Sequence, residues 1–305
     1  MTTEWIPERE VTAEQATHLI GARFHDLRGA PVRLLATGWD NTVFLVGEEW
    51  AFRFPRRQIA VPGVEREIAT LPLLAPRLPL PIPEPRYIGE PSADFPWPFW
   101  GARLIPGHEF AAVRPPDEHR TAIATETGAF LRTLHDPALA RAVGFTLPFD
   151  PMRRADTPSR AAKTSTRLAT LARLGLWQPD PTVDAFLAMA RDQPPPAGDP
   201  VVVHGDLHAR HLLLAPDGRA AGVIDWGDVC LADPAVDLSL AYAAFTGAAR
   251  KAFLTEYGPV PPARETAART LALNLTATLA EYAAETARPS LLAESLTSLH
   301  RAVTD

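Results

Sequence analysis

Two aspartates, each after a short apolar run, are the residues of this sequence best suited to chemistry. Residues 201–203 lead to a segment that contains Asp206, and residues 221–224 lead directly to Asp225. The aspartates are 19 positions apart, and we expect a hairpin between them to bring both strand ends to one edge. Phosphoryl transfer uses such a pair, because one carboxylate orients the attacking hydroxyl and the other holds the Mg²⁺ that bridges the phosphates. The alternative is that each aspartate caps a turn.

Histidines surround the first of these aspartates. We interpret His204 as structural, with its imidazole bonded to nearby backbone. Asp206, His208 and His211 also allow a zinc interpretation, but structural zinc takes a fourth ligand that is usually cysteine. The sequence has one cysteine, Cys230, outside this segment, so we favour phosphoryl transfer over zinc.

The segment resembles the catalytic and metal-binding segments of the aminoglycoside and macrolide phosphotransferase family, small-molecule relatives of the protein kinases. The resemblance rests on His204-x-Asp206-x-x-x-x-His211 followed by Ile224-Asp225. The catalytic loop of protein kinases has the same spacing, with asparagine in the last place. By this resemblance Asp206 is the catalytic base and Asp225 the principal metal ligand, with Mg²⁺ as cofactor and ATP or GTP as co-substrate.

Two further segments are similar to the family. Residues 130–135 resemble the first helix of its larger lobe, and residues 233–238 resemble the helix start after its metal-binding loop. We interpret Asp237 as a structural carboxylate at that helix start.

His211 departs from the commonest family pattern, which has asparagine there. Mg²⁺ prefers oxygen ligands, so a histidine nitrogen would be an unusual ligand. Either His211 ligates or closely approaches the metal, or Asp225 holds the ion with water while His211 contacts phosphate. Macrolide kinases of the family are similar in carrying histidine here, which favours a macrolide over an aminoglycoside as acceptor.

A kinase-like site also needs a cation on the third strand of its smaller lobe, paired with a carboxylate on a helix. The first lysine is Lys163, so Arg53 is the candidate, and family members with arginine in this strand are similar. Arginine is always charged and can bind phosphate through two N–H groups. We expect Glu67 to be its partner, although Glu65 could face the same way, and Arg53 could instead be a surface charge.

Two backbone segments complete the expected nucleotide site. The turn that contains Gly38 and Asn41 separates the first two expected strands and is a candidate for the loop over the phosphates. At the hinge, the main chain of Leu104 and Ile105 could bond the purine. Because main chain makes such contacts, the sequence does not distinguish ATP from GTP.

Acidic and aromatic residues are candidates for the acceptor site, since antibiotic substrates of this family are bulky and carry amines. Asp228 lies three residues after Asp225, and Glu281 and Glu285 share a helix face by their spacing of four. Trp177 could form an apolar wall. Except for Asp228, the competing interpretation is an exposed helix charge or a core tryptophan.

A scaffold of strands followed by helices must position these residues. The pattern predicts an α+β chain, and the resemblance implies a two-lobe protein-kinase-like fold with a small antiparallel sheet and a larger helical lobe. Residues 1–105 would form the nucleotide-binding lobe with one helix, the hinge would lie at about 103–107, and residues 108–305 would form the catalytic and substrate-binding lobe. The smaller lobe is expected to have strands at 32–36, 41–46, 50–54, 85–89 and 99–105 and a helix at 64–74. The larger lobe is expected to have a helix ending near residue 135, helices at 160–174, at 182–191 and after 234, and a strand-turn-strand segment at 201–225 with its turn at 216–218.

The composition fits a globular cytoplasmic enzyme. Apolar residues make up 46% and charged residues 22% of the 305 positions, and the net charge of −6 does not support a nucleic-acid partner. We find neither a secretory leader nor an apolar stretch near the roughly 18 residues that span a bilayer. We therefore expect a monomer or weak homodimer in the cytoplasm, with a small-molecule substrate and no membrane partner.

The expected activity is transfer of the γ-phosphate of ATP or GTP to a hydroxyl of a small molecule, with an antibiotic favoured. A metabolite kinase of the same fold, acting on choline, a sugar or a homoserine-like alcohol, is one alternative, and a small closed pocket would favour it. A kinase-like module that binds a ligand without turnover is another, because His211 and Arg53 depart from the usual pattern.

Overall fold

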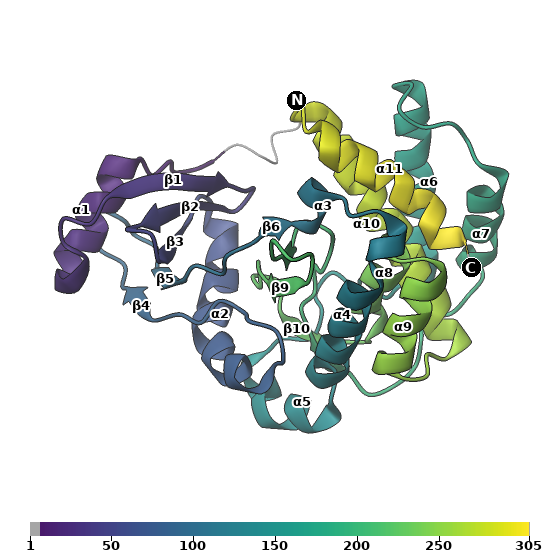
Figure 1. Ribbon diagram of the computed structural model, residues 1–305, viewed down its shortest axis with the longest axis horizontal. Coiled ribbons are helices and arrows are strands. Elements are labelled where there is room, and N and C mark those ends of the chain that lie inside the picture. The colour runs from purple at the N-terminus through teal and green to yellow at the C-terminus, as the bar shows by residue number, and fades with distance from the viewer. Residues whose placement is uncertain (1–6, 305) are drawn as a thin grey trace. The chain divides into compact units, whose positions relative to one another are not determined.

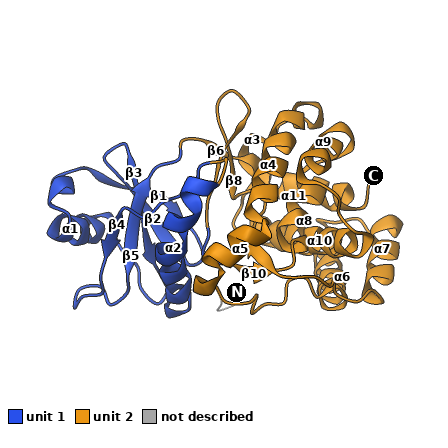
Figure 2. Ribbon diagram, turned by 90° about the horizontal axis from the view of Figure 1, so that it is seen from below, with its two compact units in different colours: residues 1–77, 81–105, 226–229 blue, residues 78–80, 106–225, 230–305 orange. Residues whose placement is uncertain are grey.

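The computed structural model describes residues 7–304, which divide into two compact units (Figure 2). Unit 1 contains residues 7–77, 81–105 and 226–229, and unit 2 contains residues 78–80, 106–225 and 230–304. The functional assignment of residues 1–105 and 108–305 as nucleotide-binding and catalytic lobes stays a prediction.

Unit 1 is built on an antiparallel sheet. In the described residues this sheet has five strands in the order β1-β2-β3-β5-β4. The strands are β1 (Val32–Thr37), β2 (Asn41–Val46), β3 (Trp50–Pro55), β4 (Tyr87–Gly89) and β5 (Phe99–Arg103). The five predicted strands are confirmed, with small shifts at their ends.

Aromatic side chains form the core of unit 1 on one face of the sheet. Phe44, Phe52, Phe54 and Phe99 are buried, and Phe54 stacks on Phe99 with ring centroids 4.5 Å apart. Successive residues of a strand point to opposite faces. Arg53, which lies between Phe52 and Phe54, therefore points to the other face.

Two α-helices accompany the sheet in the described part of unit 1, and the prediction of a single helix was wrong. The predicted helix is α2 (Val61–Leu74), which contacts β5. The additional helix is α1 (Ala13–Arg23), which contacts β1 (Figure 1). A capping box starts α1, because the side chains of Thr12 and Gln15 each accept a hydrogen bond from the other's backbone N–H. The Thr-x-x-Gln signal was present in the sequence.

Unit 2 is mainly helical (Figure 1). Its described α-helices are α3 (Phe110–Val113), α4 (Thr121–Leu134), α5 (Pro137–Val143), α6 (Thr157–Arg173), α7 (Pro181–Arg191), α8 (Ala235–Ala244), α9 (Gly247–Tyr257), α10 (Pro262–Glu285) and α11 (Pro289–Val303). The helices predicted for this part of the chain are confirmed. Every residue of α8 is buried, because small and apolar side chains cover it on all sides and α10 and α11 pack against it. None of the helices described is long and apolar enough to cross a membrane.

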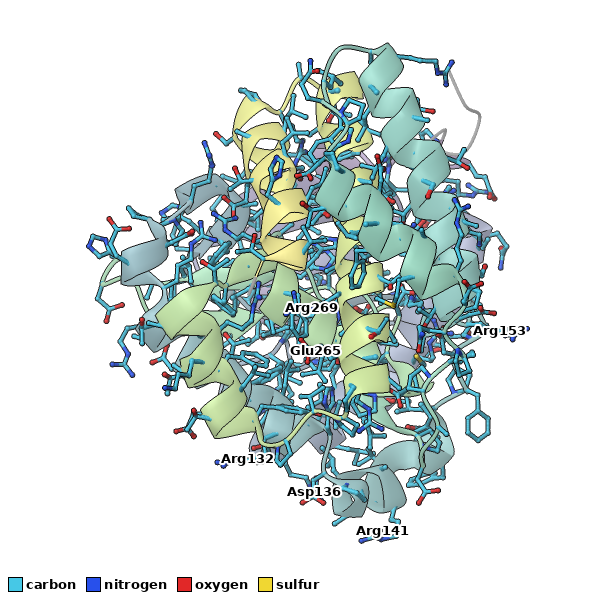
Figure 3. The ribbon with its side chains drawn as sticks, turned by 90° about the vertical axis from the view of Figure 1, so that its right-hand side faces the viewer. Arg132, Asp136, Arg141, Arg153, Glu265 and Arg269 are labelled. Atoms are coloured by element: carbon cyan, nitrogen blue, oxygen red, sulfur yellow. The ribbon has the colours of Figure 1, made fainter. Side chains whose placement is uncertain are left out.

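Arginine side chains tie the last helices of unit 2 together. Arg269 lies one turn after Glu265 on α10 (Figure 3), and its Nε donates to Glu265 Oε1 at 2.8 Å. Its Nη1 donates to the Ala302 carbonyl at 3.0 Å, near the end of α11. One guanidinium thus donates to acceptors on two helices, which the compact ammonium group of a lysine would do less well.

Short strands in unit 2 precede both candidate aspartates. The strands are β6 (His108–Glu109), β7 (Val201–Val203), β8 (Leu212–Leu214), β9 (Ala220–Val223) and β10 (Cys230–Ala232). Within the described residues β7 pairs with β10, while β6, β8 and β9 form a separate sheet with β8 in the centre.

This pairing corrects the expected hairpin. The turn at residues 216–218 is confirmed between β8 and β9, but the strands that precede Asp206 and Asp225 do not pair with each other. The reason is the run of leucines in β8, which forms a buried strand of its own and occupies the position beside β9. The residues from 204 to 211 are therefore a loop between two sheets.

Candidate active site

A buried carboxylate from α8 holds the backbone of the loop between β7 and β8. Asp237 Oδ2 accepts from the His204 backbone N–H at 2.7 Å, and Oδ1 accepts from the Gly205 N–H at 3.0 Å. His135 Nε2 lies 3.2 Å from the same Oδ2. Asp237 was expected to be a structural carboxylate at a helix start. It lies in the first turn of α8, but its bonds go to the loop and not to its own helix.

His204 joins this loop to the end of β9. Its Nε2 donates to the Ile224 carbonyl at 2.9 Å, and its Nδ1 accepts from the Asp206 backbone N–H at 3.2 Å. Burial lowers the pKa of His204, so the neutral ring with a proton on Nε2 satisfies both partners. The backbone of Asp206 is thereby linked to the residue that precedes Asp225.

The Asp206 side chain is accessible, with 32% of its surface exposed. Its Oδ2 lies 3.5 Å from His208 Nε2 and 3.9 Å from His211 Nδ1. Burial tends to raise the pKa of the Asp206 carboxyl, but the neighbouring His208 and His211 outweigh it and hold the pKa well below its usual range. Asp206 is therefore an ionised carboxylate near neutral pH, as a general base must be.

His211 connects Asp206 and Asp225. Its Nδ1 lies 2.8 Å from the Asp206 carbonyl oxygen, and its Nε2 lies 3.2 Å from Asp225 Oδ2. Burial by itself lowers the pKa of His211, but the Asp225 carboxylate raises it above its usual value. Both partners can only accept, so the ring donates from both nitrogens. A contact of His211 with a metal stays a prediction, because a metal would displace one of these ring protons.

Asp225 has an unusual backbone for a residue with a side chain. Its φ is +69°, in the left-handed region, and its side chain is 46% exposed. Such a conformation costs roughly 1–3 kcal/mol and is found where the surroundings impose it, often at functional sites. The exposed carboxylate offers the oxygen ligands that Mg²⁺ prefers.

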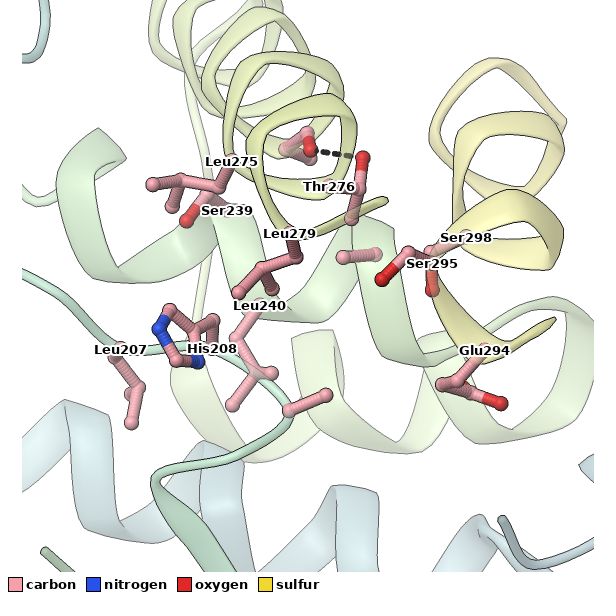
Figure 4. A pocket seen from close by; sticks show the side chains of 13 residues that line it. Leu207, His208, Ser239, Leu240, Leu275, Thr276, Leu279, Glu294, Ser295 and Ser298 are labelled. Atoms are coloured by element: carbon pink, nitrogen blue, oxygen red, sulfur yellow. Dashed lines mark hydrogen bonds between the residues drawn. The ribbon is translucent and has the colours of Figure 1, made fainter. Parts of the chain in front are cut away.

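His208, which lies near Asp206, also lines a small cavity in unit 2 (Figure 4). The cavity is bounded by His208 and by side chains of α8, α10 and α11 that include Leu240, Leu279 and Ser295. Burial lowers the pKa of His208 to about 4, so the ring is neutral. It packs against the His211 ring at a tilt of 31°, with ring centroids 3.9 Å apart.

Asp206, His208 and His211 are the three residues for which the sequence also allowed a zinc site. Ligand atoms of Asp206, His208 and His211 all lie within 4.8 Å of one another. In the described part of the chain this group offers three ligands, whereas structural zinc takes four. A structural zinc ion would therefore lack one ligand in this group.

Unit 1 contains the expected ion pair on the sheet face that carries Arg53. Arg53 Nη1 donates to Glu67 Oε1 at 2.8 Å, with Glu67 1% exposed and Arg53 11% exposed. Trp100, which pairs with Arg53 across β3 and β5, donates from Nε1 to Glu67 Oε2 at 3.2 Å. Each carboxylate oxygen thus has a donor. Glu65 is exposed, so Glu67 is the partner of Arg53, and Arg53 is not a surface charge.

The remaining nucleotide-site candidates lie at the ends of strands in the same sheet. The Gly38 N–H donates to the Asn41 carbonyl at 2.9 Å, and the Gly38 carbonyl accepts from Arg56 at 2.7 Å. The turn is therefore closed by hydrogen bonds of its own. The Leu104 N–H donates to the Glu49 carbonyl at 2.7 Å, which leaves the Leu104 carbonyl and the backbone of Ile105 as candidates for bonding a purine.

The sequence profile of the phosphotransferase enzyme family, APH, matches residues 31–269, which is more than half of the chain. The chain belongs to this family.

Solved structures share the fold of this phosphotransferase-family chain. The GDP complex of wild-type aminoglycoside 2'-phosphotransferase-IIIa is 23% identical with a TM-score of 0.67, over 96% of this chain and 99% of that one. Macrolide 2'-phosphotransferase type I is 22% identical with a TM-score of 0.59, over 95% and 98%. Macrolide 2'-phosphotransferase MphH from Brachybacterium faecium is 24% identical with a TM-score of 0.56, over 92% and 96%. The predicted kinase-like fold, with an antiparallel sheet followed by a helical part, is confirmed.

A curated relative matches a much shorter part of this family member. The uncharacterized protein YcbJ from Bacillus subtilis (strain 168) is 43% identical over 56 residues. This match spans 18% of the chain and 18% of the relative's own length.

The candidates for the acceptor site do not all lie on open surface. Trp177 is 5% exposed and packs against His300, with ring centroids 5.0 Å apart. Glu281 forms an ion pair with Arg167, and Glu285 is exposed at the end of the same helix. Asp228 belongs to unit 1 and is partly exposed. A contact with an acceptor stays a prediction for all four residues, Asp228, Trp177, Glu281 and Glu285.

Sequence reasoning missed the role of Trp100. The signal that identifies it is its position directly opposite Arg53 on the neighbouring strand, where side chains share a face. That register depends on the pairing of β3 with β5, which are far apart in the sequence, so the sequence alone did not reveal it.

Proposed function

We propose that this phosphotransferase-family chain transfers the γ-phosphate of ATP or GTP to a hydroxyl of a small molecule. The observation that carries the proposal is the bridge made by His211, which contacts the Asp206 carbonyl and the Asp225 carboxylate. It keeps an ionised, accessible carboxylate close to a second carboxylate that can ligate a divalent cation. Membership of the phosphotransferase enzyme family supports the same reaction class.

In the proposed reaction Asp206 orients the acceptor hydroxyl and takes its proton. The hydroxyl oxygen forms a bond to the γ-phosphorus, and the bond from that phosphorus to the bridging oxygen of the diphosphate breaks. Mg²⁺ held by Asp225 would neutralise charge on the phosphates. His211 would orient Asp225 as a hydrogen-bond donor, as residues behind metal ligands commonly do. Arg53, held by Glu67, would donate to phosphate oxygens.

Antibiotics are the favoured acceptors, with macrolides before aminoglycosides. The preference rests on His211, since macrolide kinases are similar in having histidine at this position. The structural neighbours include both aminoglycoside and macrolide 2'-phosphotransferases. A metabolite kinase of the same fold is the alternative, and a non-catalytic ligand-binding module is a second one.

The test is mass spectrometry of small molecules incubated with the protein, Mg²⁺ and either ATP or GTP. The panel contains macrolides, aminoglycosides and simple amino alcohols. A mass gain of one phosphate on a macrolide, lost in Asp206→Ala, would support the full proposal. A gain on an amino alcohol alone would favour the metabolite kinase. No transfer and no nucleotide hydrolysis by folded protein would favour the binding module.

Replacing Arg53 with Met is expected to weaken binding of the nucleotide about tenfold or more, since charge-assisted hydrogen bonds to phosphate are lost. Isothermal calorimetry with ADP and GDP measures the change. Arg33→Met is the matched control, because Arg33 is also a strand arginine with a carboxylate partner, Glu48, but is 62% exposed. Equal affinities for the Arg53→Met, Arg33→Met and unsubstituted proteins would contradict a role for Arg53 in nucleotide binding.

A further inference from the structure

Helix α2 holds one carbonyl of the loop that follows Asp225. Arg66 Nη2 donates to the Gly227 carbonyl oxygen at 2.6 Å. A Cβ atom placed on Gly63 would lie 2.9 Å from the same oxygen, which is closer than real Cβ contacts. Gly63 and Arg66 are three residues apart and therefore share a helix face. The Gly227 carbonyl thus lies close to the α2 backbone at Gly63 and accepts a hydrogen bond from the guanidinium of Arg66. All three residues belong to unit 1.

The loop held in this way is short and closely packed. Trp226 and Val229 are buried, and the Val229 N–H donates to the Trp226 carbonyl at 3.0 Å to close a turn. Gly227 follows Asp225 by two residues along the chain. The left-handed backbone of Asp225 persists only if the residues around it impose that conformation. A bond that fixes Gly227 limits the conformations available to Asp225 through the chain itself.

Glu67, the residue that follows Arg66 in α2, contacts a second part of the candidate site. Glu67 holds Arg53, while Arg66 holds Gly227. Consecutive residues of one helix thus reach the candidate phosphate-binding arginine and the loop after the candidate metal ligand. We propose that Arg66 is a positioning residue that fixes the loop 226–229 and, through it, the backbone of Asp225. Its consequence for metal binding rests on the function proposed above.

The first test is amide hydrogen exchange of residues 225–229 in the protein without ligands. Arg66→Met removes the donor, and Gly63→Ala pushes against the same carbonyl from the helix backbone. Both are expected to speed exchange of this loop about tenfold, the effect of losing one charge-assisted hydrogen bond. Arg66→Lys, which keeps one charged donor, is expected to give a smaller change. Glu65→Gln changes an exposed residue of the same helix and is expected to leave exchange unchanged.

The second test is the Mg²⁺ concentration for half-maximal phosphoryl transfer. Arg66→Met and Gly63→Ala are expected to raise it about tenfold while the KM for the acceptor stays the same. A merely structural role would lower the amount of folded enzyme without changing the Mg²⁺ requirement. Unchanged loop exchange in Arg66→Met would overturn the proposal, even if Gly63→Ala fails to fold. An inactive but folded unsubstituted protein would refute the proposed function, while the exchange measurement would still decide whether Arg66 holds the loop.

Discussion

Replacing Asp206 with Asn is expected to lower kcat for phosphoryl transfer about 10³-fold, the usual effect of losing a general base. The amide cannot take the proton of the acceptor hydroxyl and presents a donor where the carboxylate presents an acceptor. The side chain of Asp206 is partly exposed, and its contacts to His208 and His211 are both longer than a good hydrogen bond. His208 and His211 lower the pKa of this carboxyl, so its charge contributes to folding stability. Because these contacts are long, the loss in the free energy of unfolding should be small beside the loss in kcat. Steady-state kinetics and urea unfolding measure the two quantities.

Asp199→Asn is the control for this prediction, since Asp199 is an exposed aspartate in the loop before β7. It is expected to keep the activity and the stability of the unsubstituted protein. Nucleotide affinity should also persist in Asp206→Asn, because the proposal gives Asp206 no contact with phosphate. If the Asp206→Asn enzyme kept a tenth or more of the activity, with Asp199→Asn as reference, Asp206 would not be the base.

The sequence was a good guide to residues whose role depends on their position along the chain. Asp206 and Asp225 follow short strands, and Arg53 lies in the middle of a strand whose alternation separates it from Phe52 and Phe54. A strand end or an alternating pattern is a local property, so a single sequence contains it. Glu67 could also be found in this way, because it lies on a recognisable helix, but its choice over Glu65 needed the observed burial.

Contacts between distant parts of the chain were not predictable in the same way. Arg66 and Gly227 are 161 positions apart, and Asp237 reaches back 33 positions to His204. Both contacts depend on how helices pack, which one sequence does not encode as a pattern. The wrong hairpin had a different cause. The three residues of β8 are too few to show a period, so the strand that separates the two aspartates could not be recognised.

Replacing Asp237 with Ala is expected to lower the free energy of unfolding by about 3–5 kcal/mol, the usual result of breaking a buried charged network. Asp237 is fully buried, and its carboxylate accepts from the His204 and Gly205 N–H groups. Alanine leaves these donors and His135 Nε2 without their shared acceptor in a site that water does not reach. The loop that carries Asp206 would lose its attachment to α8, so kcat should fall as well. Urea unfolding and kinetics on the folded fraction measure both effects.

Asp237→Asn separates the charge from the shape of this side chain. The amide keeps one acceptor oxygen but turns an NH₂ group toward the second backbone donor, so its effect should be close to that of alanine and not close to zero. Asp199→Ala is the control, and it is expected to change the free energy of unfolding by less than about 0.5 kcal/mol. A loss below about 1 kcal/mol in Asp237→Ala would mean that other contacts hold the loop. Together with Asp206→Asn, the result distinguishes a residue that performs the chemistry from one that holds the loop in place. Substitution of the first should lower mainly the activity, whereas substitution of the second should lower the stability strongly as well.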